Sequence, residues 1–229
     1  MRYVLFFYSF LFVFSCSQKQ ELPSIQSLNT KEDTVSYSLG ADIGENLKRQ
    51  QIEFDYDALI TGLVDAFETN EIKLDQNERR KAMIDLQKLI RDKATEVTRN
   101  NLEEAEAFLE INKVENTDVK ETPTGLQYRV LRQGEGDSPT AKDKVKVHYV
   151  GRLLNGQEFD SSIARGKPAE FTLNQVIKGW TEGLQLMKEG DKFEFFIHPR
   201  LGYGGRSSPK IPGNSCLIFE VELIEVLES

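Results

Sequence analysis

The content of proline and glycine changes near residue 120, and this change divides the chain into two parts that must fold differently. Residues 30–113 contain no proline and only three glycines. From residue 125 onward both residue types are frequent, and β-branched residues alternate with polar ones. Because proline and glycine interrupt helices and alternation at a period of two is typical of strands, we predict an α+β chain with helices first and strands second. The charged, proline-containing segment 114–124 has the composition of a linker.

The first part is predicted to form three helices. Thr30 and Asp33 have the spacing of a capping box at the start of the first helix. The apolar residues of this helix recur every four positions, at Val35, Leu39, Ile43 and Leu47. A second helix should begin near Asp55, with an apolar face of Leu59, Ile60, Leu63, Val64 and Phe67. A third should run from Asp75 to Lys113, with a stripe of Met83, Leu86, Ile90, Ala94, Val97, Asn101 or Leu102, Ala105 and Phe108.

The third helix is too long to be buried by its own chain. About 39 residues at about 1.5 Å each give a helix of roughly 58 Å, and two short helices offer too little surface to form a core with it. Such a helix could pair with a second copy, bridge two domains as a solvated stalk, or lie exposed with a weak apolar stripe. We favour the first use and predict a homodimer formed by intertwined helices through residues 30–113.

The N-terminal residues are predicted to lie outside the fold. In residues 1–15 one arginine precedes an apolar run of twelve residues, which is too short to span a bilayer core of about 30 Å and fits a secretory signal peptide. Ser15 and Cys16 follow as at a bacterial lipoprotein cleavage site, although Phe14 departs from the usual pattern. An ordinary secretory peptide cleaved nearby is the alternative. With Cys16 lipidated, residues 16–29 would form a flexible tether, and we expect an exported protein anchored in the bacterial cell envelope, on its periplasmic face or at the cell surface.

Composition argues against several classes of protein. The 29 basic and 37 acidic residues give a net charge of −8, so nucleic acid, whose binding needs clustered lysine and arginine, is not an expected partner. Two cysteines and two histidines are too few for a metal cluster of the Cys/His type, and no metal is expected. With Cys16 lipidated, Cys216 has no disulfide partner, and in its apolar run it is predicted to be a small buried hydrophobe.

The second part is predicted to form one antiparallel sheet with a short helix across it. Strands are expected at residues 125–133, 144–153, 193–197 and 217–226. Glu158–Asp160 should return after a hairpin turn with Asn155-Gly156 as its two central residues, since both can take a positive φ. Within 144–153, Val145, Val147 and Tyr149 share one face. The short helix is expected within residues 176–186 and carries Trp180.

The common catalytic motifs do not occur in this sequence. A nucleophile elbow, a phosphate-binding loop and an HExxH helix are all missing, and the two histidines are predicted to be solvated. The chain instead has aromatic residues and one acid at strand ends, on the short helix and in a loop: Tyr149, Phe159, Asp160, Phe171, Trp180, Tyr203 and Phe219. Large aromatic residues mostly stabilise cores, so on this ground alone both a core and a pocket remain open.

Longer runs of sequence favour the pocket. HYVGRLLNGQEFDSS, RGKPAEFTLNQVIKGWTEGLQLMKEGDKFEFFI, GYG and LIFEVEL follow one another within residues 125–229. In this order and spacing they resemble the FKBP-type peptidyl-prolyl cis-trans isomerase domain. SYSLGADIGENLKRQ and a long helix ending in AFLEINK are similar to the N-terminal dimerisation region of the dimeric, Mip-like branch of that family. The resemblance implies a five- or six-stranded antiparallel sheet wrapped round a short helix, with a shallow apolar pocket for the substrate proline.

The resemblance also implies roles for individual residues. Asp160 matches the pocket acid and Tyr203 the hydroxyl that meets the substrate carbonyl, so both are expected to be catalytic. The expected substrate-binding residues are Trp180 as the pocket floor, Tyr149, Phe159 and Phe219 as walls, Phe171, Val176 and Ile177 before the helix, Arg165 beside the acid, and Ile211 on a covering loop. The chain departs from the family at Ala169, where eukaryotic members carry an aromatic residue, and in a shorter loop at residues 206–214.

The activity implied by the resemblance needs no cofactor, because isomerisation of an Xaa–Pro amide breaks no bond. The expected partners are proline-containing unfolded or folding polypeptides and macrolide FKBP inhibitors. Two such domains on helical stalks would form a cradle with chaperone activity. A binding module with a vestigial pocket and a purely structural envelope lipoprotein are the alternatives, and the intact aromatic set with Asp160 disfavours both.

Overall fold

The computed structural model describes residues 27–227 apart from residues 51 and 70. The chain divides into two compact units between Asn46 and Leu47. The predicted signal peptide, Cys16 and most of the predicted tether lie outside the described residues. Among the described helices, none combines the length and the apolar character that crossing a membrane requires.

Two short helices precede the long one, and each begins where a side chain caps it. At the start of α1, Lys31–Arg49, the Thr30 hydroxyl accepts the Asp33 N–H and the Asp33 carboxylate accepts the Thr30 N–H, both at 3.0 Å, which confirms the capping box. Helix α2, Tyr56–Val64, is capped by the Asp55 carboxylate. It then continues as a π-helical turn, η1, Asp65–Thr69, instead of remaining α-helical through Phe67. No residue of α1 or α2 is buried.

Helix α3, Gln76–Glu115, has 40 residues and is therefore about 60 Å long. It begins with a complete capping box, in which the Asp75 carboxylate accepts the Glu78 N–H and the Glu78 carboxylate accepts the Asp75 N–H. It ends two residues beyond Lys113, inside the segment expected to be a linker. The next part of that segment forms a two-residue strand, β1, Lys120–Glu121.

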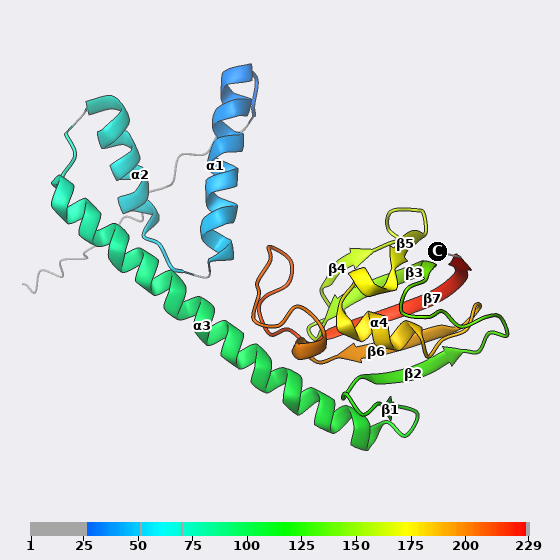
Figure 1. Cartoon of the computed structure of the whole chain (residues 1–229). Helices are drawn as coiled ribbons and strands as arrows, with labels where there is room; N and C mark the ends of the chain where they lie inside the picture. The colour runs from blue at the N-terminus through cyan, green and yellow to red at the C-terminus, as the bar shows by residue number, and fades with distance from the viewer. Residues whose placement is uncertain (1–26, 51, 70, 228–229) are drawn as a thin grey trace, which may run out of the picture. The chain divides into compact units, whose positions relative to one another are not determined.

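The strands form one antiparallel sheet of seven strands in the order β1-β2-β6-β7-β3-β4, with β5 also paired to β3 (Figure 1). After β1 the strands are β2 Gln127–Arg132, β3 Lys144–Leu153, β4 Glu158–Ser161, β5 Ala169–Thr172, β6 Lys192–Ile197 and β7 Leu217–Leu227. The antiparallel sheet is as predicted, but the expectation of five or six strands is wrong. After α3 the chain forms β1, which pairs with β2 as an additional edge strand, with Lys120 opposite Tyr128.

One face of the sheet is covered by α4, Lys178–Leu184 (Figure 1). Along β3 every second residue from Val145 to Leu153 is buried, which confirms the predicted face. Helix α4 buries Trp180 and Leu184 against the sheet and approaches β6 so closely that a Cβ at Gly183 would lie 2.5 Å from the Phe195 ring. Two single turns, η2 Leu173–Gln175 and η3 Pro199–Leu201, complete the domain.

The β3–β4 hairpin has a three-residue loop instead of the predicted two-residue one. Gly156 has a φ of +82°, whereas Asn155 does not have a positive φ. The Gly156 N–H donates to the Leu153 carbonyl at 2.9 Å, and the Leu153 N–H donates to the Gln157 carbonyl at 3.0 Å. This is the turn with a bulge at a left-handed glycine that closes three-residue hairpins. The Asn-Gly pair therefore predicted the position of the turn correctly but not its type.

The C-terminal third of α3 packs on the sheet through a second apolar cluster: Ala105, Leu109, Phe196 and Cys216, with Phe108 beside them. Next to this cluster the Asn112 amide donates to the Gln127 side chain at 2.9 Å, and Gln127 donates to the Leu109 carbonyl at 2.8 Å. Burial raises the pKa of the Cys216 thiol to about 12, so the residue is the small buried hydrophobe that was predicted. The buried residues of α3 all lie at this end of the helix. In its earlier turns Met83 and Leu89 remain half exposed.

Candidate functional site

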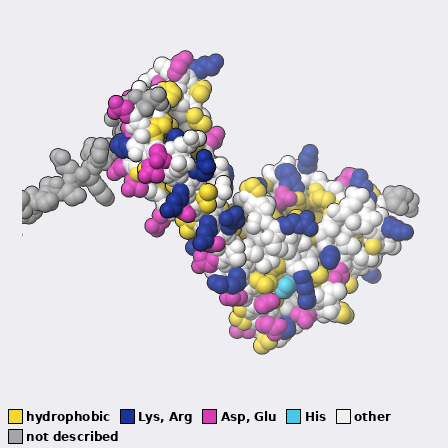
Figure 2. Space-filling view, turned by 60° about the vertical axis from the view of Figure 1, so that its left-hand side comes forward, with side chains coloured by type: hydrophobic (Ala, Val, Ile, Leu, Met, Phe, Trp, Pro, Cys, Tyr) yellow, Lys and Arg dark blue, Asp and Glu magenta, His cyan; other side chains and the backbone are white. Residues whose placement is uncertain are grey.

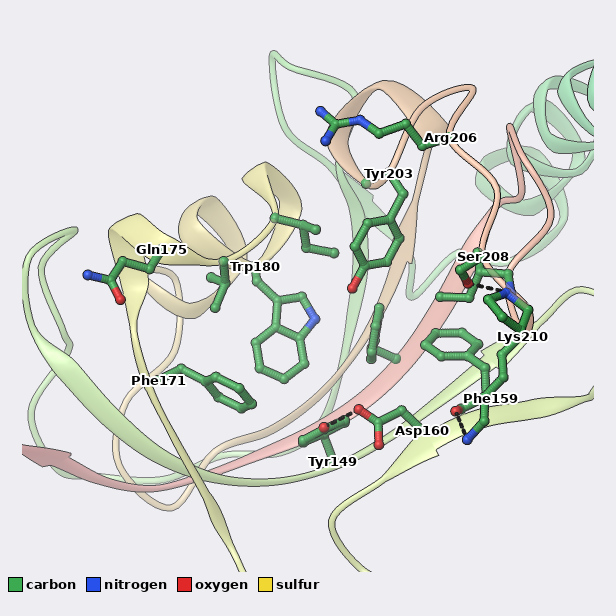
Figure 3. Close-up of a pocket in the computed structure, with 16 residues that line it drawn as sticks. Tyr149, Phe159, Asp160, Phe171, Gln175, Trp180, Tyr203, Arg206, Ser208 and Lys210 are labelled. Carbon is green, nitrogen blue, oxygen red and sulfur yellow. Dashed lines mark hydrogen bonds between the residues drawn. The ribbon is translucent and has the colours of Figure 1, made fainter.

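A cavity of about 850 Å³ opens beside α4, between strands of the sheet and the loop that follows η3 (Figure 3). The structure brings ten of the eleven expected pocket residues to its lining: Tyr149, Phe159, Asp160, Phe171, Val176, Ile177, Trp180, Tyr203, Ile211 and Phe219. Arg165 does not line the cavity and reaches it only through Asp160 and Tyr149. The lining also includes Gln175, Gly202, Arg206, Ser208, Pro209 and Lys210, which the sequence did not single out except as part of a loop.

Trp180 belongs both to the hydrophobic core and to the cavity lining. A core and a pocket, the two alternatives for the aromatic set, are therefore not exclusive. Its side chain is only 4% exposed. Its ring meets Tyr149, Phe171 and Phe219 edge to face, with centroids 5.1, 5.4 and 5.2 Å away. Edge-to-face contacts between aromatic rings fix their relative orientation. The three neighbours therefore hold the indole rigidly at the base of the cavity.

The Trp180 indole N–H is buried and has no hydrogen-bond partner among the described residues. Leaving a buried donor unpaired costs about 1–3 kcal/mol. The packing of the neighbouring rings must offset this cost.

The walls depend on a glycine in β3. A Cβ at Gly151 would lie 2.7 Å from the rings of both Phe159 and Phe219, which is closer than side chains approach one another. These two rings meet edge to face at 5.4 Å. Since β4 and β7 flank β3 at this register, the absence of a side chain at residue 151 lets rings from two different strands meet over the middle one.

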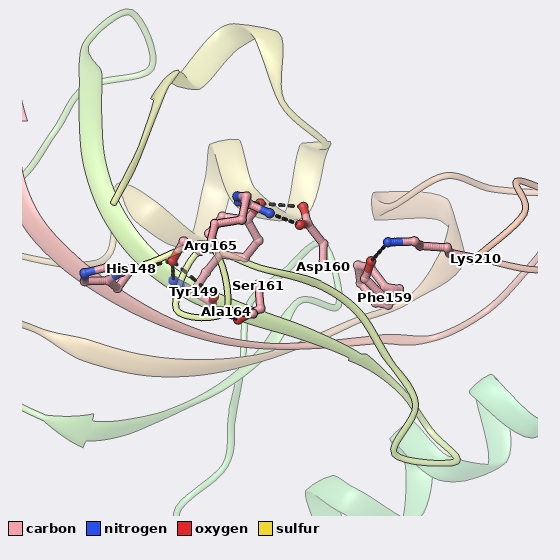
Figure 4. A network of polar contacts seen from close by, with 9 residues as sticks. His148, Tyr149, Phe159, Asp160, Ser161, Ala164, Arg165 and Lys210 are labelled. Atoms are coloured by element: carbon pink, nitrogen blue, oxygen red, sulfur yellow. Dashed lines mark hydrogen bonds and ion pairs between the residues drawn. The ribbon is translucent and has the colours of Figure 1, made fainter. Parts of the chain in front are cut away.

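Asp160, Tyr149 and Arg165 form a closed polar network at the edge of the cavity (Figure 4). The Tyr149 hydroxyl donates to one Asp160 oxygen at 2.5 Å and accepts from the Arg165 guanidinium at 2.8 Å. Arg165 also forms an ion pair with the other Asp160 oxygen. Both carboxylate oxygens are thus occupied, and the acid is held in one orientation.

The network keeps Asp160 ionised. Burial alone would raise the pKa of this carboxyl group, but the hydrogen bonds from Tyr149 and Arg165 outweigh it, and the pKa lies below the ordinary value of 3.8. Because the folded-state pKa is below that of the unfolded chain, the stabilisation is present above pH 4, roughly, and is lost as the pH falls through the folded-state pKa. Near neutral pH the cavity therefore contains a carboxylate.

The Tyr203 hydroxyl is directed into the cavity (Figure 3). Burial, and then the charge of Asp160, raise the pKa of this phenol above its ordinary value of 10.0. Tyr203 is thus a protonated hydrogen-bond donor at neutral pH, and its ring is 46% exposed at the mouth of the cavity.

The loop of residues 206–214 supplies four of the six cavity residues that the sequence did not identify: Arg206, Ser208, Pro209 and Lys210. The Lys210 ammonium donates to the Phe159 carbonyl at 3.2 Å, which draws the loop toward β4. Arg206 and Ser208 lie on the same loop (Figure 3). No periodicity marks such a loop, so the family resemblance was the only signal for it.

The two histidines do not line the cavity. His148 contacts the Ser162 hydroxyl at 3.0 Å. The imidazole of His198 accepts the Arg200 N–H at 3.1 Å, and burial lowers its pKa. Neither is simply solvated as predicted: His148 is partly buried beside Ser162, and His198 lies between β6 and α3, 4.0 Å from Glu106. In the described part of the chain, no group of three His, Cys, Asp or Glu residues could hold a metal ion.

Comparison with known proteins identifies the family. A family model described as FKBP-type peptidyl-prolyl cis-trans isomerase matches residues 136–224. A second, described as the domain amino terminal to FKBP-type peptidyl-prolyl isomerase, matches residues 32–130. The chain belongs to the FKBP-type peptidyl-prolyl cis-trans isomerases. It is therefore an enzyme that interconverts the cis and trans forms of Xaa–Pro bonds.

Relatives of this isomerase match along most of their length. It is 39% identical to FkpA of Aeromonas hydrophila over 92% of this chain and 81% of that one, and 41% identical to Mip of Coxiella burnetii over 87% and 88%. The crystal structure of FkpA from Escherichia coli matches with a TM-score of 0.67 at 34% identity, over 88% of this chain and 99% of that one. The predicted architecture, a helical N-terminal part followed by an FKBP-type sheet, is confirmed.

Replacing Tyr149 with phenylalanine tests the polar network. The variant loses the hydroxyl that donates to Asp160, so the pKa of that carboxyl group is expected to rise toward 3.8. Titration of the Asp160 side-chain carboxyl carbon by NMR measures it. Tyr128→Phe is the control, because Tyr128 stacks on Phe193 in another part of the sheet. An unchanged Asp160 pKa in Tyr149→Phe would show that Arg165 alone keeps the acid ionised.

Proposed function

We propose that this isomerase twists the Xaa–Pro bond of its substrate in the cavity above Trp180, with Tyr203 and Asp160 as catalytic residues. The observation that supports the proposal is the combination of aromatic walls with one ionised acid and one protonated phenol in a single cavity. No nucleophile is required, since the reaction only rotates an amide bond.

The chemistry explains why apolar walls suit the reaction. A planar amide has resonance that places negative charge on its oxygen and positive charge on its nitrogen, and twisting the bond removes this charge separation over a barrier of about 18–20 kcal/mol. A cavity that excludes water favours the less polar twisted state over the planar one. Such a preference for the transition state over the ground state is what accelerates a reaction.

The polar groups have separate roles in this proposal. Tyr203 donates a hydrogen bond to the carbonyl next to the proline and holds it while the other side of the bond rotates. Asp160 orients the wall residue Tyr149 and meets the rotating carbonyl through a weak contact. The competing view is that the Asp160–Arg165 pair is purely structural. The remaining binding residues, Phe159, Phe171, Val176, Ile177, Ile211 and Phe219, enclose the proline ring.

We further propose that the enzyme is a homodimer formed through residues 30–113. On α1, Val35, Leu39 and Ile43 lie on one face and are 59%, 62% and 47% exposed. Hydrophobic side chains are visible at the surface of the helical part (Figure 2). An amphipathic helix is stable when its apolar face is covered, and a second copy offers the same face in a self-complementary contact. A dimer would present two cavities to one unfolded client, which supports a chaperone role.

The site of action proposed here is the bacterial cell envelope, where a lipid on Cys16 would anchor the exported protein. A relative, 39% identical over 87% of this chain, is named outer membrane protein MIP of Legionella longbeachae. The apolar run before Cys16 supports the same placement. The clients are then exported proteins whose proline bonds isomerise within tens of seconds or more when uncatalysed.

Replacing Tyr203 with phenylalanine tests the catalytic assignment. Loss of one hydrogen bond to the substrate should reduce kcat/KM for an Xaa-Pro-Phe peptide about threefold to tenfold, as measured by the rate of cis-to-trans isomerisation. Tyr128→Phe is the control and should leave the isomerisation rate unchanged. A macrolide FKBP inhibitor should suppress the acceleration by the natural enzyme. Unchanged turnover in Tyr203→Phe would remove the hydroxyl from the mechanism.

Replacing Leu39 with glutamate tests the dimer. A charge buried in an interface without a partner costs several kcal/mol, so the variant should sediment as a monomer while residues 17–229 of the natural sequence sediment as a dimer. Ser38→Glu, next to it but off the apolar face, is the control and should remain dimeric. A natural sequence that sediments as a monomer at micromolar concentration contradicts the proposal.

The mass of the protein purified from bacterial membranes tests the anchor. The mature chain is expected to begin at Cys16 and to carry the added mass of its acyl chains, and Cys16→Ser should abolish both. Cys216→Ala should retain the lipid. A mature chain that begins elsewhere and has no added mass would favour an ordinary secretory signal peptide.

A further inference from the structure

The loop of residues 206–214 forms one rim of the cavity but makes many of its hydrogen bonds with itself. The Ser208 N–H donates to the Ile211 carbonyl at 2.8 Å, the Ile211 N–H to the Ser208 hydroxyl at 3.0 Å, and the Gly213 N–H to the Ser207 hydroxyl at 2.9 Å. Internal bonds of this kind keep the shape of a loop and leave its position undetermined. Contacts with other elements must therefore hold Ile211 over the cavity.

Helix α3 provides such contacts. The Asn101 side-chain amide donates to the Gly213 carbonyl at 2.9 Å, across 112 positions of sequence. The Asn214 side-chain amide donates to the Thr98 carbonyl at 3.2 Å, across 116 positions. Thr98 and Asn101 are three residues apart, so they lie on the same face of the helix. The two bonds run in opposite directions and hold the end of the loop against one turn of α3.

Asn214 also ties this attachment to the catalytic side of the loop. Its φ is +57°, a left-handed conformation that asparagine tolerates better than most residues. Its own N–H donates to the Gly204 carbonyl at 2.7 Å, next to Tyr203 in the chain. One residue therefore joins α3, the end of the loop and the backbone beside the Tyr203 phenol.

Besides the hydrogen bonds, the contact includes a close approach of Gly213 to α3, where an added Cβ would lie 3.0 Å from the Thr98 hydroxyl oxygen. A small cavity of about 90 Å³ lies beside this contact, and Asn101, Glu104, Pro212 and Cys216 are among its lining residues. Farther along α3, by contrast, Ala105 and Leu109 pack tightly on the sheet. Losing the Asn101 bond should therefore free the loop without detaching the helix.

We propose that Asn101 and Asn214 are positioning residues for the isomerase cavity: α3 holds the loop 206–214 in place over the substrate, so this helix sets how tightly the enzyme binds its substrate. The inference rests on the proposed location of the active site. It gives the long helix a role in the reaction in addition to connecting the two parts of the chain.

The test uses Asn101→Ala and Asn214→Gly in the full chain. Alanine is a good helix former and glycine adopts positive φ without strain, so each variant removes a side-chain hydrogen bond without opposing the local backbone. Asn100→Ala is the matched control, because Asn100 is the adjacent, exposed asparagine of the same helix. The KM and kcat for an Xaa-Pro-Phe peptide and the amide hydrogen exchange of residues 206–214 are measured for each.

We expect KM to rise about threefold to tenfold in Asn101→Ala and Asn214→Gly, with a smaller change in kcat, since each loses one hydrogen bond. Exchange should become faster in residues 206–214 and remain unchanged around Ala105 and Leu109, and Asn100→Ala should behave as the natural enzyme. Unchanged exchange in the loop overturns the attachment. Faster exchange with unchanged KM overturns the link to substrate binding. Unchanged turnover in Tyr203→Phe, by contrast, would count against the proposed catalytic role of Tyr203 and leave the attachment of the loop untouched.

Discussion

The catalytic domain depends on a mismatch between a long apolar sheet face and the short helix that covers it. Strands β3 and β7 pair over ten residues, from Lys144 opposite Leu227 to Leu153 opposite Leu217, a length of about 33 Å. Helix α4 has seven residues and is therefore about 10 Å long. It buries only part of that face. Aromatic side chains and loops must cover the remainder, and the cavity opens where they do so incompletely.

This arrangement gives apolar surface and polar groups to the same cavity at little cost to stability. Trp180 is held by three edge-to-face contacts and so belongs to the core while its surroundings form the base of the cavity. Asp160 would be costly to bury alone, but Tyr149 and Arg165 occupy both of its oxygens. The resulting site combines fixed aromatic walls with an oriented carboxylate, and apolar walls suit a reaction whose transition state loses charge separation.

Helix α3 is attached to the catalytic domain in two physically different ways. Near its C-terminus, apolar packing around Leu109 and the amide pair of Asn112 and Gln127 make the helix part of the domain. About two to three turns earlier, side-chain amides join it to the loop 206–214 beside a small cavity. The first attachment resists separation through buried surface, whereas the second fixes geometry through directional bonds. Together they leave the N-terminal two thirds of α3 with exposed apolar residues.

The sequence by itself determined the features that depend on neighbours in the chain. The capping groups Thr30, Asp55 and Asp75 located the helix starts, and the alternation from Val145 to Leu153 identified the buried face of β3. Together with family resemblance, the aromatic set located ten of the cavity residues.

Only the tertiary structure decided the features that depend on partners far away in sequence. It added β1 to the sheet edge, placed Arg165 behind Asp160 instead of in the lining, and brought Lys210 to the Phe159 carbonyl. It also joined Asn101 to Gly213. Periodicity reports which face of an element is buried, but a hydrogen bond across more than a hundred residues depends on how whole elements pack, and no local pattern encodes it.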